Sequence, residues 1–168
     1  RIIMTLDDID AFVFDFDGVL TNNLVYLNQE GVESVACSRA DGLAFDVLRK
    51  LNKPAYILST EKNSVVSARA KKLKIPVLQG IENKLVGIQE IIKKENCLIE
   101  NVFYVGNDLN DYRVMSLCGM TGCPADSHDK IKQISDFIFK KNGGHGIVRE
   151  LLEDVLNLDF LEILYRKG

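Results

Sequence analysis

The sequence predicts one α/β domain of three layers, in which a doubly wound parallel sheet lies between helices. Short runs rich in β-branched and aromatic residues alternate with longer segments of helical periodicity, an order typical of βαβ units. The first run is apolar at nearly every position, which suits a strand buried on both faces of a parallel sheet. A length of 168 residues matches a single domain, so we expect 1–168 to fold as one unit.

The individual elements follow from these patterns. The predicted strands are Ala11–Phe16, Ala55–Ser59, Val102–Val105 and Phe137–Phe139, with short strands near Val77 and Met120. The predicted helices are Asp41–Leu51, Lys62–Leu73, Lys84–Lys94, Asn110–Leu117, Ser127–Ile134 and Gly146–Leu158. In the third helix one apolar stripe has helical spacing, at Leu85, Ile88, Ile91 and Ile92. A functional site is expected at the carboxyl ends of the strands.

One segment interrupts the alternation. The β-rich runs Leu24–Leu27 and Val32–Ala36 flank the turn residues Asn28–Gly31. This arrangement predicts a small β-hairpin inserted directly after the first strand. The sequence contains no internal repeat and no linker-like segment.

The composition restricts the partners that we expect. A chain with 46% hydrophobic and 27% charged residues is typical of a globular protein. The net charge of −3, without a sustained basic run, argues against nucleic acid as a partner. The apolar stretches are far shorter than the roughly 20 residues of a membrane helix. Asp7, Asp8 and Asp10 interrupt any apolar region of a signal peptide, so we expect a cytoplasmic protein without membrane partners.

The four cysteines allow more than one interpretation. Cys37, Cys97, Cys118 and Cys123 could form two disulfides, but without a secretory signal reduced thiols are favoured. Cys118 and Cys123 together with His128 suggest a zinc site. Their spacing matches no common zinc pattern and a fourth ligand is missing, so we favour structural thiols.

The chemistry concentrates in the segment that follows the first strand. Residues two apart on an extended chain point to the same side, so Asp15 and Asp17 can project into a common site. Two close carboxylates repel each other unless a proton or a cation separates them, and Mg²⁺ is a hard ion that prefers oxygen. Gly18 allows a sharp turn after the pair. The alternative is a turn that only ends the strand, but a buried acidic pair without a use is costly.

This segment resembles a known family. The run from Asp15 to Asn22, DFDGVLTN, is similar to motif one of the haloacid dehalogenase (HAD) superfamily of phosphohydrolases, DxDG(V/T)xT. Ser59 after the second central strand, Lys84 at the start of a helix and Gly106–Asp111 resemble the later motifs in the right order. The match spans most of the chain, and matches in order are more specific than one motif alone. It implies a Rossmann-like fold, here without a large cap domain.

The resemblance also implies roles for individual residues. Asp15 would be the catalytic nucleophile that forms an aspartyl-phosphate, and Asp17 the general acid and base. Ser59 and Lys84 would bind the transferring phosphoryl oxygens.

A Mg²⁺ cofactor is implied as well. Its ligands would be Asp15, the main-chain carbonyl of Asp17 and a side chain of motif four, Asn107 or Asp108. The family commonly has a carboxylate where this chain has Asn107, which brings no charge. Asp108 or Asp111 could compensate for this difference.

A narrower branch of the family can be recognised. The hairpin in place of a large cap resembles the capless branch that includes phosphatases of 3-deoxy-manno-octulosonate 8-phosphate, and the tail Asn142–Glu150 resembles its GGxGxxRE signature. Motif two, Ser59-Thr60-Glu61-Lys62, is closer to the phosphatases of KDN and N-acylneuraminate 9-phosphates and to the HAD-like domain of CMP-sialic acid synthetases. The implied substrate-binding residues are Thr21, Glu61, Arg69 and Lys72.

The branch further implies assembly. Its members are homotetramers in which the hairpins pack together and neighbouring subunits close the site over the substrate, which excludes water. Gly143–Gly146 is a candidate closing element, or else only a flexible turn. We expect His145 to be a surface residue.

Three functions therefore compete. The first is a Mg²⁺-dependent phosphatase of an acidic sugar phosphate, an ulosonate 8- or 9-phosphate with nine carbons favoured, in sialic acid or lipopolysaccharide biosynthesis. The second is a weakly active or non-catalytic oligomerisation module related to CMP-N-acylneuraminate synthetase, which Asn107 favours. The third is a receiver-type phosphoacceptor domain, but receivers have no counterpart of Asp17. The intact Asp15 and Asp17 favour the first function.

Overall fold

A six-stranded parallel sheet forms the centre of the computed structural model, which describes residues 4–166. Its strands are β1 (Ala11–Phe14), β4 (Ala55–Leu58), β5 (Val77–Leu78), β6 (Val102–Val105), β7 (Met120–Cys123) and β8 (Phe137–Ile138). The order across the sheet is β5-β4-β1-β6-β7-β8. After β1 the chain adds β4 and β5 on one side of it. It then crosses back and adds β6, β7 and β8 on the other side. This topology confirms the doubly wound fold and places its switch point between β1 and β6.

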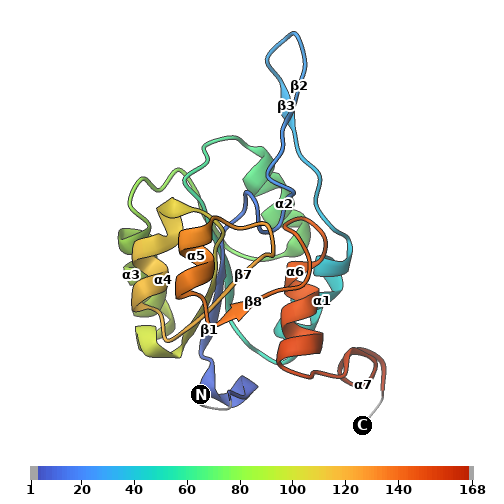
Figure 1. The fold of residues 1–168 in the computed structure, drawn as a ribbon. Helices are drawn as coiled ribbons and strands as arrows, with labels where there is room; N and C mark the ends of the chain where they lie inside the picture. Colours follow the sequence, from blue (N-terminus) through green and yellow to red (C-terminus); the bar gives the residue numbers. More distant parts are fainter. Residues whose placement is uncertain (1–3, 167–168) are drawn as a thin grey trace.

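Helices cover both faces of the sheet (Figure 1). They are α1 (Ala40–Lys50), α2 (Val65–Leu73), α3 (Lys84–Glu95), α4 (Tyr112–Leu117), α5 (Asp129–Ile134), α6 (Ile147–Glu150) and α7 (Phe160–Tyr165). Alternate residues of β1 point to opposite faces, so Phe12 and Phe14 pack against α1, α2 and α6. Val13 packs in the other core with α3, α4 and α5. The predicted three layers are thus confirmed.

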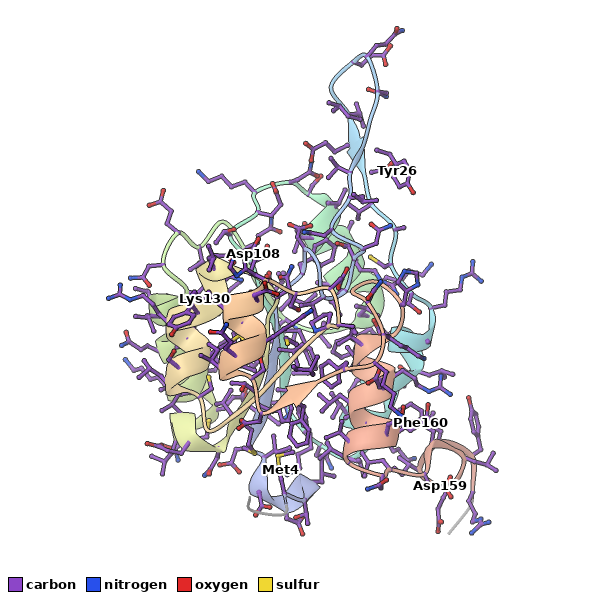
Figure 2. All side chains as sticks on the ribbon, viewed as in Figure 1. Met4, Tyr26, Asp108, Lys130, Asp159 and Phe160 are labelled. Carbon is purple, nitrogen blue, oxygen red and sulfur yellow. The ribbon has the colours of Figure 1, made fainter. Side chains whose placement is uncertain are left out.

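The hairpin after β1 is present and has short strands. β2 (Tyr26–Leu27) pairs in antiparallel fashion with β3 (Glu33–Ser34). The hairpin projects from the end of the sheet at which the parallel strands finish, and Tyr26 points away from the body of the domain (Figure 2). Both strands are shorter than the predicted runs, and towards the body of the domain the two arms form one further antiparallel bridge, between Thr21 and Cys37.

Several predicted boundaries are wrong, and local hydrogen bonds explain them. α2 starts at Val65 and not at Lys62, since the Asn63 side chain accepts a hydrogen bond from the Val65 N–H. The predicted helix Gly146–Leu158 continues from α6 as a π-helical turn over Leu151–Val155 and then ends. α7 was not predicted. It follows Asn157, whose φ of 54° stops the preceding helix.

The zinc hypothesis receives no support. Cys118 and Cys123 are buried free thiols, and His128 caps α5 by accepting a hydrogen bond at Nδ1 from the Lys130 N–H. Among residues 4–166 no three side chains of His, Cys, Asp or Glu are arranged to hold a metal ion. Within the same range, no helix is both long enough and apolar enough to cross a membrane.

Candidate active site

Asp15 stands directly after β1, at the switch point of the sheet. Its N–H donates to the Val105 carbonyl at 2.9 Å, which continues the pairing between β1 and β6. The side chain is 7% exposed, and its Oδ1 accepts a hydrogen bond from the Phe16 N–H at 2.7 Å. The central strand therefore holds this carboxylate rigidly at the edge where a ligand is expected.

A tight turn follows Asp15 and brings Asp17 back to the same edge. Gly18 has a φ of 83°, a conformation that favours glycine. Thr21 is buried, and its Oγ1 accepts hydrogen bonds from the N–H groups of Gly18 and Asn23, both at 3.1 Å. In this structure the Thr21 hydroxyl therefore braces the turn.

Asp15 and Asp111 share the buried ammonium group of Lys84. Lys84 Nζ, at the start of α3, lies 3.1 Å from Asp15 Oδ1 and 2.7 Å from Asp111 Oδ1. All three side chains are almost completely buried. Because charges in such surroundings are poorly screened, each interaction is stronger than it would be in water.

Asp111 is held by four donors. Oδ1 accepts from Lys84 and from the Tyr104 hydroxyl at 2.6 Å, while Oδ2 accepts from the N–H groups of Asn107 at 2.9 Å and Asp108 at 3.3 Å. A carboxylate with this many donors has no free lone pair for a metal ion. The structure thus gives Asp111 an anchoring position and not the place of a metal ligand that the sequence offered. No pattern in the sequence marks Tyr104 as part of the site.

The charges in this cluster are unequal. Burial raises the pKa of Asp15 well above its ordinary value, with a further contribution from the Asp111 carboxylate. Burial acts to lower the pKa of Lys84, but the carboxylates of Asp15 and Asp111 outweigh burial, and the pKa of Lys84 is raised. Burial also acts to raise the pKa of Asp111, but Lys84 outweighs it and the pKa is lowered. Two carboxylates share one ammonium group, so either a proton or a further cation is needed to balance the charge of Asp15.

Three polar groups, from Asp15, Asp17 and Asn107, meet where such a cation could bind. The Asn107 amide lies 2.9 Å from the main-chain oxygen of Asp17 and 3.1 Å from Asp15 Oδ2. With Nδ2 turned inward, the amide donates a hydrogen bond to each. With Oδ1 turned inward, three oxygens face one another, and neighbouring ligands of an octahedral Mg²⁺ lie about 3.0 Å apart. The donor set of Asp15, Asp17 and Asn107 therefore fits a magnesium ion.

Asp108 lies beside this cluster and is solvent-exposed, at the end of the sheet from which the hairpin rises (Figure 2). One of its oxygens accepts a hydrogen bond from the Leu109 N–H at 2.8 Å. A cavity of about 80 Å³ opens here, lined by Asp15, Asp17, Asn23, Thr60, Asn107, Asp108 and Asn110. It is small, but the carboxylates and amides around it make it the cavity in which chemistry is expected.

The residues of motif two follow β4, the neighbour of β1. Ser59 is buried, and its Oγ accepts a hydrogen bond from the Glu61 N–H at 3.1 Å. One oxygen of Glu61 accepts from the N–H groups of Lys62 and Asn63, both at 2.9 Å. Burial raises the pKa of Asp17, and the Glu61 carboxylate contributes. A raised pKa suits a group that must donate a proton.

Arg69 and Lys72 are not brought to the Asp15 cavity. Together with Arg39, Arg49 and Lys74 they line a separate basic cavity of about 470 Å³ between α1 and α2. The Arg69 guanidinium donates a hydrogen bond to the Ser38 carbonyl at 3.0 Å.

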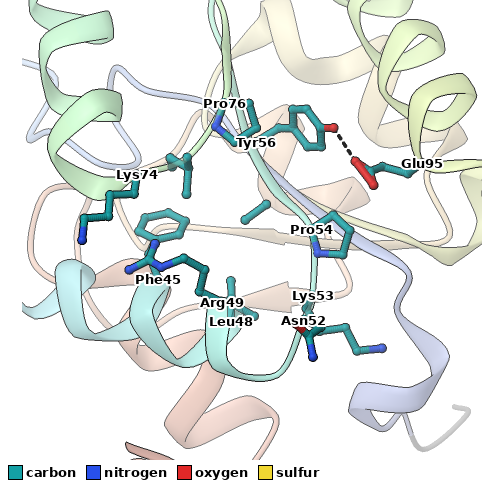
Figure 3. Close-up of a pocket in the computed structure, with 12 residues that line it drawn as sticks. Phe45, Leu48, Arg49, Asn52, Lys53, Pro54, Tyr56, Lys74, Pro76 and Glu95 are labelled. Carbon is teal, nitrogen blue, oxygen red and sulfur yellow. Dashed lines mark hydrogen bonds between the residues drawn. The ribbon is translucent and has the colours of Figure 1, made fainter.

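A third cavity lies at the amino ends of β4 and β5, whereas Asp15 follows the carboxyl end of β1. Figure 3 shows the residues that line this cavity. Its volume is about 380 Å³, and it is bordered by Phe45, Pro54, Tyr56, Pro76 and Glu95 among others. The Tyr56 hydroxyl is bonded to Glu95 there. This cavity is larger than the one at Asp15 but contains none of the predicted site residues.

The glycine-rich tail packs against the turn after β1. The Gly144 N–H donates to the Val19 carbonyl at 3.0 Å, and the Gly143 N–H donates to Asp126 Oδ1 at 3.0 Å. A Cβ atom on Gly143 would come within 2.0 Å of the Gly18 carbonyl oxygen. The tail therefore supports the turn that follows Asp15 in its own chain. His145 is exposed, as expected.

Comparisons with known proteins agree with this geometry. The family of haloacid dehalogenase-like hydrolases matches residues 21–151. The chain is 32% identical over 156 residues to the 3-deoxy-D-manno-octulosonate 8-phosphate phosphatase KdsC of Escherichia coli K12, which covers 92% of this chain and 83% of the relative.

Solved structures are similar as well. A HAD family hydrolase of Streptomyces avermitilis superposes with a TM-score of 0.90 at 40% identity, over 95% of this chain and 91% of the other. The octulosonate 8-phosphate phosphatase of Moraxella catarrhalis, in complex with magnesium, phosphate and KDO, gives a TM-score of 0.85 at 30% identity, over 89% and 87%.

Proposed function

The chain belongs to the haloacid dehalogenase-like hydrolases, and on this basis we propose that it is a Mg²⁺-dependent phosphatase of ulosonate phosphates. The observation that carries the proposal is the position of Asp15. Its Oδ1 is held by Lys84 and the Phe16 N–H, and its Oδ2 faces the oxygen cluster formed with Asp17 and Asn107. A carboxylate held in this way can act as a nucleophile beside a metal ion.

The reaction would proceed in two displacements. In the first, a carboxylate oxygen of Asp15 attacks phosphorus, the bond to the sugar oxygen breaks, and Asp17 donates a proton to that oxygen. In the second, Asp17 takes a proton from a water molecule, which attacks phosphorus and releases inorganic phosphate and the Asp15 carboxylate. The raised pKa of Asp17, caused by burial and then by Glu61, supports its role as the acid of the first step.

The remaining residues would stabilise the negative charge of the phosphoryl group and hold the metal ion. Lys84 is charged and buried beside Asp15, so it would stabilise the phosphoryl oxygens during transfer. Ser59, at the end of the adjacent strand β4, would donate a hydrogen bond to the same group. Asp15, the Asp17 carbonyl and Asn107 would hold Mg²⁺, which supplies positive charge where two anions meet, and Asp108 lies at the rim of that cavity.

An ulosonate 8-phosphate is the substrate that the relatives support, because KdsC acts on 3-deoxy-D-manno-octulosonate 8-phosphate. On the same ground we propose a role in lipopolysaccharide precursor synthesis. A nine-carbon substrate of the sialic acid type is the second candidate, favoured by the motif-two residues Ser59–Lys62. Thr60 lines the Asp15 cavity, and Glu61 lies close enough to influence Asp17.

The experiment is a comparison of kcat/KM for octulosonate 8-phosphate, KDN 9-phosphate and N-acetylneuraminate 9-phosphate in the presence of Mg²⁺. We expect the octulosonate to be preferred by at least roughly tenfold, since groups that a pocket is built to bind discriminate by this amount or more. Preference for a nine-carbon substrate would replace the first candidate by the second. No turnover of any of the three would favour the non-catalytic module.

Self-association through the hairpin is a further part of the proposal. Five apolar side chains of the hairpin are between 55% and 65% exposed, at Leu24, Val25, Tyr26, Leu27 and Val32. Such a surface favours burial against other copies of the chain, and a homotetramer would shield the open cavity from water. Arg69 and Lys72 do not line the small Asp15 cavity of their own chain, and we propose that they contact the substrate in an assembly, at the site of a neighbouring subunit.

Light scattering of the wild type and of Leu27→Glu tests the assembly. We expect a tetramer for the wild type and a smaller species for the variant, whereas a monomeric wild type would contradict the assembly. The four free cysteines suit the reducing cytoplasm, the compartment that we propose.

A further inference from the structure

Tyr104 carries a hydroxyl group into the apolar layer beneath the active site. The side chain lies on β6, is completely buried, and packs in the core shared with Val13, Ile88 and Val114. A phenol in such surroundings is destabilising unless its hydroxyl finds a partner. Its partner is Asp111 Oδ1 at a distance of 2.6 Å. Phenylalanine would fill the same space, so the hydroxyl itself needs an explanation.

That explanation lies in the other contacts of Asp111. One of its oxygens also accepts the Lys84 ammonium, and the second accepts the N–H groups of Asn107 and Asp108. The position of this single carboxylate therefore sets both the ammonium beside Asp15 and the main chain that carries Asn107. A shift of Asp111 would displace both at once.

Among these four donors, Tyr104 has the most rigid attachment. Lys84 has a long and flexible side chain, and Asn107 and Asp108 lie in the loop after β6. Tyr104 lies within β6, which pairs with β1 on one side and β7 on the other. Its hydroxyl therefore connects Asp111 to the middle of the sheet, the part of the fold that moves least.

We propose that Tyr104 is a positioning residue that acts through Asp111. Asp111 in turn holds Lys84 against Asp15, and it holds Asn107 in the oxygen cluster. This inference rests on the proposed function, because it assigns the hydroxyl a role in phosphoryl transfer. Tyr104 does not touch the Asp15 cavity, whose lining does not include it.

The chain provides a matched control. Tyr56 is also a buried tyrosine, it lies in the same core on the neighbouring strand β4, and its hydroxyl also bonds a carboxylate, Glu95. That bond is made at the C-terminal end of α3 (Figure 3), whereas Lys84 stands at its start. Tyr56 and Tyr104 flank Val13 in the register of the sheet. Tyr104→Phe and Tyr56→Phe thus remove the same group from the same core, but only the Tyr104 hydroxyl bonds a carboxylate that contacts Lys84 and the N–H groups of the site loop.

The first test compares steady-state kinetics of the two variants. We expect Tyr104→Phe to lower kcat about tenfold with KM changed less than twofold, since small misplacement of catalytic groups slows the chemical step. Tyr56→Phe is expected to retain the kcat of the wild type, although both variants lose thermal stability. A wild-type kcat in Tyr104→Phe, or an equal loss of kcat in both variants, would overturn the proposal.

The second test does not depend on activity. In amide hydrogen exchange we expect the N–H groups of Asn107 and Asp108 to exchange at least severalfold faster in Tyr104→Phe, and at the wild-type rate in Tyr56→Phe. Unchanged exchange in Tyr104→Phe would overturn the proposal. If the wild type itself shows no turnover, the proposed function has failed, and this measurement still decides whether Tyr104 positions Asp111.

Discussion

The ammonium group of Lys84 lies 3.1 Å from Oδ1 of Asp15, and both side chains are almost completely buried. Two charged groups lose their hydration when they are buried in this way, and replacing such a pair by apolar residues is often neutral or stabilising. A fold selected for stability alone would have no need of this pair. Its place at the switch point of the sheet indicates that it serves the chemistry of the site.

Replacing Lys84 by Met is expected to destabilise the fold by about 3–5 kcal/mol at pH 8, because Asp15 and Asp111 lose their shared cation. The loss depends on pH. Without Lys84 both carboxyls have a higher pKa in the folded than in the unfolded state, so the free energy of unfolding falls as pH rises above about 4. Urea unfolding at pH 5 and pH 8 measures this. Lys53→Met is the control, since the Lys53 ammonium donates to a main-chain carbonyl, that of Ile9. Equal stabilities of the two variants at pH 8 would contradict the account.

Asp41 predicts a second dependence on pH. It is 2% exposed and accepts hydrogen bonds from the N–H groups of Val148 and Arg149, yet burial raises its pKa to about 6. Its ionisation therefore weakens the fold by up to about 3 kcal/mol as pH rises from about 4 to above 6. Asp41→Asn keeps the acceptor and lacks the charge. The free energy of unfolding of the variant minus that of the wild type should therefore increase by about 3 kcal/mol between pH 4 and pH 7. A constant difference across this range would refute the raised pKa of Asp41.

Asn107→Asp tests the oxygen cluster. A carboxylate at this position adds charge, so we expect Mg²⁺ to bind roughly tenfold more tightly. Without metal the variant lacks the amide N–H groups that can donate to Asp15 and Asp17, and should lose about 1–3 kcal/mol. The increase in Tm on adding Mg²⁺, measured against EDTA, is therefore expected to be larger in the variant. A smaller increase than in the wild type would argue against Asn107 as a ligand.

Gly143→Ala tests whether the glycine-rich tail supports the turn that follows Asp15. The added Cβ would come within 2.0 Å of the Gly18 carbonyl oxygen, so the turn must move. We expect kcat/KM to fall at least about tenfold and stability to fall by about 1–3 kcal/mol. Gly42→Ala is the control, because no atom lies within 4 Å of the added Cβ and alanine favours the helix. Wild-type kcat/KM in Gly143→Ala would show that the contact is not needed.

Much of the fold could be predicted because it follows from local patterns. The apolar strands, the stripe of the third helix and the turn residues of the hairpin depend on neighbouring positions. The C-terminal region could not be predicted in this way. A single residue of positive φ, Asn157, ends one helix, and α7 packs against α1, which is distant in the sequence.

The same distinction between local patterns and contacts of distant residues applies to the site. Asp15, Asp17 and Lys84 could be found because they stand at element ends in a characteristic order. Tyr104 could not, since alternation in a strand predicts only that it is buried and not what its hydroxyl contacts. The partnership of Asp111 with Lys84 joins residues 27 positions apart, and no local pattern contains it. The separation of Arg69 and Lys72 from the Asp15 cavity likewise depends on how α1 and α2 pack.

The most direct test of the central claim is the release of inorganic phosphate by the wild type and by Asp15→Asn. It should be measured with octulosonate 8-phosphate and nine-carbon 9-phosphates, in Mg²⁺ and in EDTA. We expect turnover that requires Mg²⁺ and a fall of at least about 10³ in kcat for Asp15→Asn, because the amide cannot form the covalent intermediate. Equal rates in the folded variant, or rates unaffected by EDTA, would contradict the claim that Asp15 attacks phosphorus beside a metal ion.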